Sequence, residues 1–221
     1  MKELIVSWSG GKDSAFALEQ LIHHKEYKVK GLLSSTSLEN ERLPIHEVTR
    51  ELIHTQAEAL GFQLYEVQLP AMSSNEKYEL EMAQQFMDLK RNGIHAIAYA
   101  DLYLEDIKEY RDGLLQRSGM CGIYPIWKKD TAAVANQFVE EGFEAVVTTV
   151  DTEKLSEEYV GRKFTKEFLS SLPGNVDPCG ENGEFHTFVY NGPIFNKKVE
   201  FTIGETFRTF EGRFVHCDLN K

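Results

Sequence analysis

The sequence is poor in cysteine, and its three cysteines do not form a group. Cys121, Cys179 and Cys217 lie far apart in the 221 residues and form no C-x-x-C pair. This spacing argues against a cysteine zinc site and against a dithiol redox motif. An odd cysteine count without a secretory leader is typical of a reducing compartment, so we expect a cytoplasmic protein.

Long apolar runs and a surplus of positive charge are also missing. The longest apolar runs, such as residues 94–100, are too short to cross a bilayer. The chain has 24 Lys and Arg against 35 Asp and Glu, which gives a formal net charge of -11. An acidic surface repels phosphate backbones and anionic lipids, so we expect neither nucleic acid nor a membrane as partner. A local anion pocket stays compatible with this charge, because it needs only one or two cations.

The first two-thirds of the chain alternate between strand and helix patterns. Three of the helical patterns end at a glycine, as helix C-termini prefer. This alternation predicts an α/β fold with a parallel sheet and flanking helices. The apolar runs that predict strands occupy residues 4–8, 29–33, 62–69, 94–100 and 145–150. The helical patterns occupy residues 14–24, 47–60, 76–91, 104–117 and 131–141.

The last third of the chain has a different character. After a helical pattern near residues 156–169, a Pro-Gly pair interrupts the periodicity. Short β-prone pieces follow at 185–190, 198–203 and 206–216, separated by turn signals. We expect a smaller mixed α+β domain here. Its boundary lies either in the segment 121–127 or near 151–155, and residues 131–150 are also compatible with an extension of the first sheet.

A phosphate-binding loop is indicated by the hexapeptide SGGKDS, which lies between the first strand and the first helix. Its members are Ser9, Gly10, Gly11, Lys12, Asp13 and Ser14. Two glycines allow a tight turn, and the following amides and helix N-terminus favour an anion. The lysine adds positive charge. The spacing is shorter than that of the G-x-x-x-x-G-K-[ST] loop. A Gly-Gly turn followed by a capping aspartate is the simpler alternative.

A second group of polar residues lies between residues 174 and 195, where three carboxylates, a histidine and four glycines occur together. If a strand starts at Glu184, then Glu184 and His186 project from one face and Thr187 from the other. A carboxylate beside an imidazole can orient the ring, hold magnesium, or bind an amine or ammonium group. A hairpin with solvated charges remains the alternative.

These motifs resemble those of known enzymes. SGGKDS is similar to the loop of the PP-loop ATP pyrophosphatase superfamily. Together with PCGENGEFHTF it resembles the diphthine–ammonia ligase family, including relatives of unassigned substrate. The resemblance runs along the whole chain and includes DLYLEDIKEYR at residues 101–111 and YPIW at 124–127. The family usually has Gly-Asp where this chain has Ala100-Asp101, so a glycine's backbone freedom is lost there.

The resemblance implies a fold, a reaction and partners. The fold is an adenine nucleotide alpha hydrolase-like, Rossmann-like domain at 1–125 and a smaller family-specific domain at 126–221. The reaction is adenylation of a carboxylate by ATP and Mg²⁺, with release of pyrophosphate, followed by amide formation with ammonia and release of AMP. The carboxylate is diphthine on elongation factor two if the host makes diphthamide. The oligomeric state is left open, with a homodimer as one option.

The resemblance also implies site residues. The catalytic set is Glu181, Glu184, His186 and Asp101. The ATP-binding set consists of the hexapeptide together with Ser34 and Ser35, which follow the second strand. The substrate-binding set is Gly180, Asn182, Gly183, Thr187 and Arg111. Magnesium is assigned to Asp13 and Asp101.

Simpler roles stay open for several of these residues. Asp13 and Asp101 also suit helix N-caps, and Arg111 also suits a surface ion pair. His46, ahead of a helical pattern, is interpreted as structural or capping. The alternative functions are a PP-loop ATP pyrophosphatase that modifies another small metabolite or tRNA, and a non-catalytic ATP-binding module. The missing cysteine pair argues against sulfur transfer, and no glutaminase domain fits in this length.

Overall fold

The computed structural model describes residues 1–70 and 73–221, which divide into two compact units. Unit 1 consists of Met1–Trp8, Asp13–Glu41 and Phe62–Lys128. Unit 2 consists of Ser9–Lys12, Arg42–Gly61 and Lys129–Lys221. Unit 2 therefore includes two short pieces of N-terminal sequence, one of which is the glycine-containing part of the hexapeptide. The domain ranges 1–125 and 126–221 remain a prediction.

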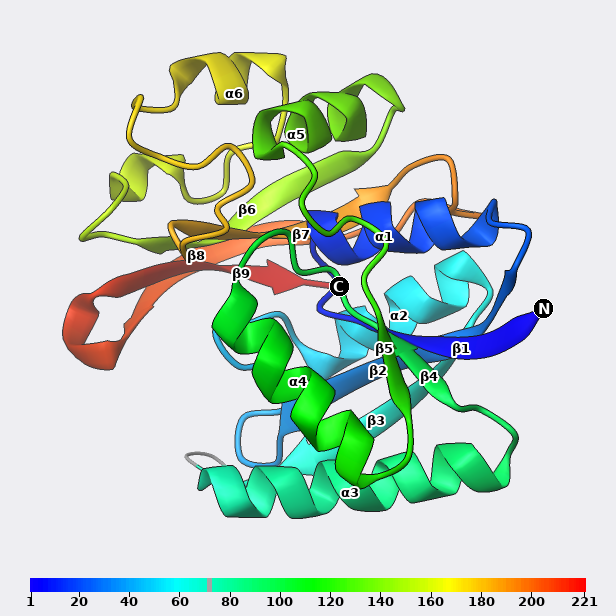
Figure 1. Cartoon of the computed structure of the whole chain (residues 1–221). Coiled ribbons are helices and arrows are strands. Elements are labelled where there is room, and N and C mark those ends of the chain that lie inside the picture. Colours follow the sequence, from blue (N-terminus) through cyan, green and yellow to red (C-terminus); the bar gives the residue numbers. More distant parts are fainter. Residues whose placement is uncertain (71–72) are drawn as a thin grey trace. The chain divides into compact units, whose positions relative to one another are not determined.

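Unit 1 is built on a parallel sheet whose strand order is β3-β2-β1-β4-β5. All four strand pairings are parallel, which confirms the predicted parallel sheet. The strands are β1 (Lys2–Ser7), β2 (Tyr27–Ser37), β3 (Gln63–Leu69), β4 (Ala96–Ala98) and β5 (Cys121–Ile123). The helices are α1 (Lys12–Ile22), whose first residue is counted with unit 2, α3 (Asn75–Arg91) and α4 (Glu105–Arg117). Figure 1 shows these elements along the chain.

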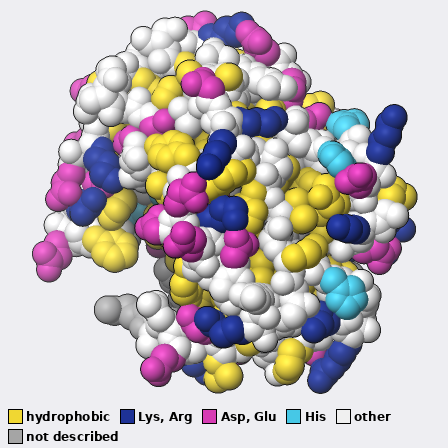
Figure 2. All heavy atoms as spheres, viewed as in Figure 1, with side chains coloured by type: hydrophobic (Ala, Val, Ile, Leu, Met, Phe, Trp, Pro, Cys, Tyr) yellow, Lys and Arg dark blue, Asp and Glu magenta, His cyan; other side chains and the backbone are white. Residues whose placement is uncertain are grey.

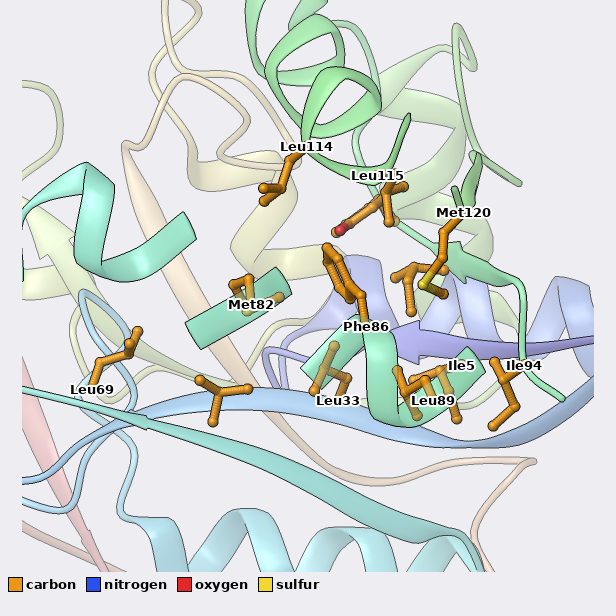
Figure 3. Close-up of a cluster of buried hydrophobic side chains, with 13 residues drawn as sticks. Ile5, Leu33, Leu69, Met82, Phe86, Leu89, Ile94, Leu114, Leu115 and Met120 are labelled. Carbon is orange, nitrogen blue, oxygen red and sulfur yellow. The ribbon is translucent and has the colours of Figure 1, made fainter. Parts of the chain in front are cut away.

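The core of unit 1 lies between this sheet and the helices α3 and α4. Phe86 of α3 is fully buried in this core and belongs to the same cluster as Ile5 of β1 and Leu115 of α4 (Figure 3). Residues Leu4 and Val6 of β1 are also fully buried and point to the opposite face of the sheet. A sheet buried on both faces explains why its strands are apolar without alternation.

Unit 2 is built on an antiparallel sheet whose strand order is β7-β6-β9-β8. Its strands are β6 (Glu144–Asp151), β7 (Phe185–Asn191), β8 (Thr202–Thr209) and β9 (Phe214–Asn220). Its helices are α2 (Arg50–Leu60), α5 (Thr131–Glu140) and α6 (Lys166–Ser171), with the 3₁₀ turns η1 (Glu157–Tyr159) and η2 (Phe210–Gly212). This unit is the smaller mixed domain that the sequence predicts.

The structure differs from the sequence prediction in four places. Residues 145–150 do form a strand, but it belongs to the antiparallel sheet. The short strand β5, rich in glycine and cysteine, has no apolar signal and was not predicted. The helix expected at 156–169 is reduced to η1 and α6. The two β pieces expected at 198–203 and 206–216 are displaced. Residues 198–201 are not in a strand, β8 begins at Thr202, and η2 separates it from β9, with positive φ at Phe210 and Glu211.

Charged side chains of both signs are distributed over the visible face in Figure 2. Acidic residues outnumber basic ones, 35 to 24, and some exposed basic side chains form ion pairs with them, as Lys77 does with Glu81 and Arg208 with Glu157. Within the described residues, the structure contains no helix with the length and apolarity that a membrane span requires.

Candidate active site

The glycine loop, Ser9–Lys12, is fastened to β7 by hydrogen bonds. The Gly10 carbonyl accepts from the Val189 N–H at 2.9 Å and from Gln56 Nε2 at 3.0 Å. Gly10 has φ of 75°, which residues with a side chain rarely adopt. A Cβ at this position would also lie 2.7 Å from Ile53 Cδ1. The tight turn therefore requires glycine, as the sequence predicts.

Lys12 connects the glycine loop to the second motif. Its N–H donates to Thr187 Oγ1 at 3.0 Å, and its Nζ donates to the Cys179 carbonyl. The ammonium group lies 6.0 Å from the ring centroid of Phe164 and 5.7 Å from that of Phe185. The residue is 4% exposed. In this structure, the side chain expected on a phosphate is directed to a carbonyl of the Pro-Cys-Gly segment.

Glu184 is a buried carboxylate, and its two oxygens have different surroundings. Its Oε1 accepts from the Asp177 N–H at 3.0 Å and from Asn182 Nδ2 at 3.1 Å. Its Oε2 is shielded from solvent and has no hydrogen-bond partner among the described residues. The residue is 3% exposed. A shielded polar atom without a partner is costly, and functional sites are where such atoms persist.

The turn that holds Glu184 contains several other predicted residues. Gly180 and Gly183 both have positive φ, at 69° and 78°, and a Cβ on Gly180 would lie 2.7 Å from the Phe185 carbonyl oxygen. The Glu181 N–H donates to Asp177 Oδ1 at 3.2 Å, while its side chain is half-buried. The glycine-rich spacing thus folds the chain tightly around Asp177 and places Glu184 immediately before β7.

Histidines gather on one face of the antiparallel sheet. Thr149 of β6 pairs with His186 of β7 on one side and with His216 of β9 on the other. Cross-strand partners project from the same face. The Thr149 hydroxyl lies 2.9 Å from His216 Nδ1 and donates to the Ile45 carbonyl at 3.0 Å. This contact places the next residue, His46, with its ring centroid 4.4 Å from that of His186.

Both rings of this pair are held in the neutral form. Burial, and next the positive charge of Lys12, lower the pKa of His46 to about 4, against a hydrogen bond to the Thr187 backbone that raises it. The pKa of His186 lies well below its usual value, chiefly because of burial. Its charged or titratable neighbours act in the same direction, namely His46, Lys12, His216 and Lys154.

Unit 1 contributes a separate group of predicted residues, namely Asp101 after β4, Arg111 in α4 and Asp13 in α1. Arg111 Nη1 lies 2.5 Å from Asp101 Oδ2, and the guanidinium lies 4.4 Å from the Tyr99 ring centroid. Burial raises the pKa of Asp101, whereas the Arg111 charge lowers it and Asp13 raises it. The capping alternatives are wrong for both aspartates, because α4 is capped at Leu104 without a side-chain bond and Asp13 lies inside the first turn of α1.

The two aspartates fit a magnesium ion that is bound mainly by a ligand's phosphates. Mg²⁺ commonly takes one or two protein carboxylates and completes its shell with phosphate oxygens and water. Asp13 and Asp101 are close enough to interact electrostatically in unit 1. The described residues contain no group of three histidines, cysteines or acidic residues arranged for a metal. The two carboxylates therefore fit only a magnesium site that a bound ligand's oxygens would complete.

Ser34 and Ser35, the predicted nucleotide contacts after the second strand, lie inside β2. The Ser34 hydroxyl donates to the Trp8 carbonyl at 2.6 Å and is 2% exposed. Ser35 is half-buried. Ser34 therefore stabilises the junction between β1 and β2.

Sequence reasoning missed two residues of unit 2 that contact the loop or the motif. Gln56 donates to the Gly10 and Val189 carbonyls. The sequence could have indicated it, because it is a polar residue in the otherwise apolar buried face of α2. His46 was interpreted as structural or capping, but Thr49 caps α2. Its position depends on residues more than 100 places away, so no local pattern indicates it.

Known proteins match the chain along nearly its whole length. A model of the diphthamide synthase N-terminal domain matches residues 1–122, and one of the C-terminal domain matches residues 130–221. Relatives named diphthine–ammonia ligase include those of Danio rerio, 24% identical over 90% of this chain and 86% of the relative, and Bos taurus, 22% identical over 86% and 79%. The Schizosaccharomyces pombe relative is 23% identical over 96% of this chain, which spans 38% of that longer protein. With both domain models matched in order, the chain belongs to the diphthamide synthase family.

Proposed function

We propose that the protein is an ATP-dependent amide ligase that adenylates a carboxylate and couples it to ammonia. In the first step a carboxylate oxygen attacks the α-phosphorus of ATP, and pyrophosphate leaves. In the second step ammonia attacks the acyl carbon, the C–O bond to AMP breaks, and one proton is released. Adenylation is needed because the hydroxide of a free acid is a poor leaving group.

The observation that carries this proposal is the link between the glycine loop and β7. Lys12 donates through its N–H to Thr187 and through its Nζ to the Cys179 carbonyl. A loop suited to pyrophosphate is thereby joined to the segment that contains Glu184 and His186. Oriented amides at a helix start stabilise the charge that develops on a leaving polyphosphate.

The name of the relatives suggests the second substrate. They are called diphthine–ammonia ligases, which names diphthine as the acid and ammonia as the nitrogen donor. We extend this pair of substrates to the present chain as part of the proposal. ATP is the activating substrate, and Asp13 and Asp101 are the residues that would hold its magnesium, which would offset the negative charge of the phosphates.

Isotope exchange tests the proposal. The purified protein is incubated with ATP, labelled pyrophosphate and elongation factor two that bears diphthine, and label entering ATP is measured. We expect exchange that depends on the diphthine protein, and AMP formation once ammonia is added. Release of ADP instead of AMP would show that a different phosphate bond is broken and would refute the proposal. Exchange with a small acid but not with diphthine would keep the reaction and change the acceptor.

A further inference from the structure

The rings of His46 and His186 lie side by side, and the proposed reaction gives His46 no role. We propose that these two imidazoles bind ammonia in its uncharged form and orient it as the nucleophile. This inference rests on the proposed function for the use of the ammonia, but the binding site itself can be tested without any acid acceptor.

The geometry leaves hydrogen-bonding capacity at both rings. Neither ring nitrogen of His186 has a hydrogen-bond partner among residues 1–70 and 73–221. The His46 ring forms a hydrogen bond with the Thr187 backbone, and this bond raises the pKa of His46. The ring is therefore the donor, and the Thr187 carbonyl accepts. The Nδ1 atom of His46 has no partner in the same part of the chain, so it is not the donor. His46 therefore has a lone pair on Nδ1.

A pair of neutral rings suits ammonia better than ammonium. Ammonia donates N–H bonds to imidazole lone pairs and keeps its own lone pair for attack on an acyl carbon. Ammonium has no lone pair and is stabilised by carboxylates. The charges that act on the pair come from Lys12 and Lys154, both positive, and from the largely neutral His216. These cations disfavour a second positive charge at the rings.

The position of His46 is fixed by contacts outside its own side chain. Thr149 donates to the Ile45 carbonyl at 3.0 Å, and Thr149 is itself in contact with His216. Ile45 has φ of 69°, a strained conformation for a β-branched residue. Strain of this kind persists where the surrounding structure enforces it, often at functional sites. His46 is thus a positioning residue, which holds ammonia against His186.

Binding is tested directly by NMR on the whole chain. The imidazole nitrogens are observed while ammonium chloride is added at alkaline pH, with potassium chloride as the matched salt control. We expect saturable shifts at His46 and His186 with the ammonium salt alone, and no shift at the exposed His23. Equal shifts with both salts, or none, would overturn the proposal whatever the enzyme's acceptor is.

Kinetics test the role of the bound ammonia. His46→Phe retains a ring of similar size but no acceptor atom, and His46→Leu, which also lacks an acceptor, is a second variant in case the phenylalanine disturbs folding. We expect the ammonia concentration for half-maximal rate to rise about tenfold or more, the effect of one lost hydrogen bond of about 1.4 kcal/mol. Pyrophosphate exchange uses no ammonia and is measured on the same variants. We expect exchange to fall by a smaller factor than amide formation does at limiting ammonia.

The outcomes separate this inference from the proposed function. His23→Phe serves as the control, since its side chain is 71% exposed. Unchanged ammonia dependence in both His46 variants, with normal exchange in the wild type, overturns the inference and leaves the ligase reaction standing. Loss of exchange in parallel with amidation also overturns it, because the pair would then act in adenylation. Ammonia-dependent NMR shifts without exchange on any acid would support the site and refute the ligase.

Discussion

The two units differ in whether their polar groups have hydrogen-bond or ion-pair partners. In unit 1 the charged groups of α4 are paired: Arg111 lies 2.5 Å from Asp101, and Asp112 accepts from Lys108 at 2.5 Å and from the Tyr124 hydroxyl at 2.9 Å. In unit 2, Glu184 Oε2 and His46 Nδ1 are shielded from solvent and lack partners among the described residues.

This difference indicates which unit carries the more reactive groups. A shielded polar group without a hydrogen bond costs about 1–3 kcal/mol, and a fold retains it where another requirement outweighs that cost. Paired groups incur no such cost and suit a supporting role. Under the proposed function, unit 2 supplies the groups that act on the acid and on ammonia.

The largest effect is expected at Glu184. Glu184→Gln preserves an oxygen for the Asp177 N–H and nearly the same volume, but it removes the charge. We expect amide formation to fall about a hundredfold or more, the scale of losing one electrostatic group at a reacting centre, while ATP still binds. Steady-state rates and calorimetric titration with ATP measure the two effects. The exposed Glu158→Gln is the control, and full turnover in Glu184→Gln would show that the motif is scaffolding.

A change at Lys12 tests whether the loop is part of unit 2. Lys12→Met removes the ammonium that donates to the Cys179 carbonyl in a 4% exposed position. We expect a loss of about 2 kcal/mol in the free energy of unfolding without nucleotide, because the carbonyl loses its partner. Denaturant unfolding measures it, with the exposed Lys25→Met as control. If Lys12 served phosphate alone, stability would stay unchanged until ATP was added.

The histidines of unit 2 make stability depend on pH. The pKa values of His46 and His216 fall from the ordinary 6.5 to about 4, in both cases chiefly through burial. Between these values the unfolded chain binds more protons than the folded chain, so stability falls as the pH drops from about 6.5 to about 4. Unfolding midpoints at several pH values show the slope, and we expect His46→Phe to flatten it. An unchanged slope in that variant would contradict the lowered pKa.

The smallest effect is expected in unit 1. Asp101→Asn weakens the ion pair with Arg111, which keeps its stacking on Tyr99. The partly exposed pair should contribute about 1 kcal/mol or less to stability. We expect a weaker magnesium dependence of ATP binding, measured by titration at graded magnesium, and a smaller rate loss than for Glu184→Gln. A loss equal to that of Glu184→Gln would remove the distinction between the units.

The sequence predicted elements best where the signal was local. The apolar runs in β1 to β3, the glycine ends of the helices and the tight turn at Gly10 all appear as expected. The predicted ends of helices and strands were wrong where tertiary contacts override the local conformational preference of the residues. Strand β5 has little apolar signal, yet it pairs with β4 because Ala96–Ala98 leaves an open edge. η2 interrupts a β-prone run through a left-handed turn at Phe210 and Glu211.

The candidate site was predicted in part for the same reason. Motif spacing indicated the glycine loop and the turn around Glu184, because glycines at fixed offsets dictate the local backbone. Spacing gave no indication that Lys12 would donate to the Cys179 carbonyl, 167 residues away in sequence. It also gave His46 only a structural or capping role, since the ring reaches His186 through a loop held by Thr149.

By itself the amino-acid sequence determined the residue types, the local turns and the family of this protein, because short-range sterics and motif order are written in adjacent residues. Tertiary structure alone decided which polar atoms are paired and which are not. Pairing depends on contacts between distant segments, and the same burial that brings His46 and His186 together also sets their charge.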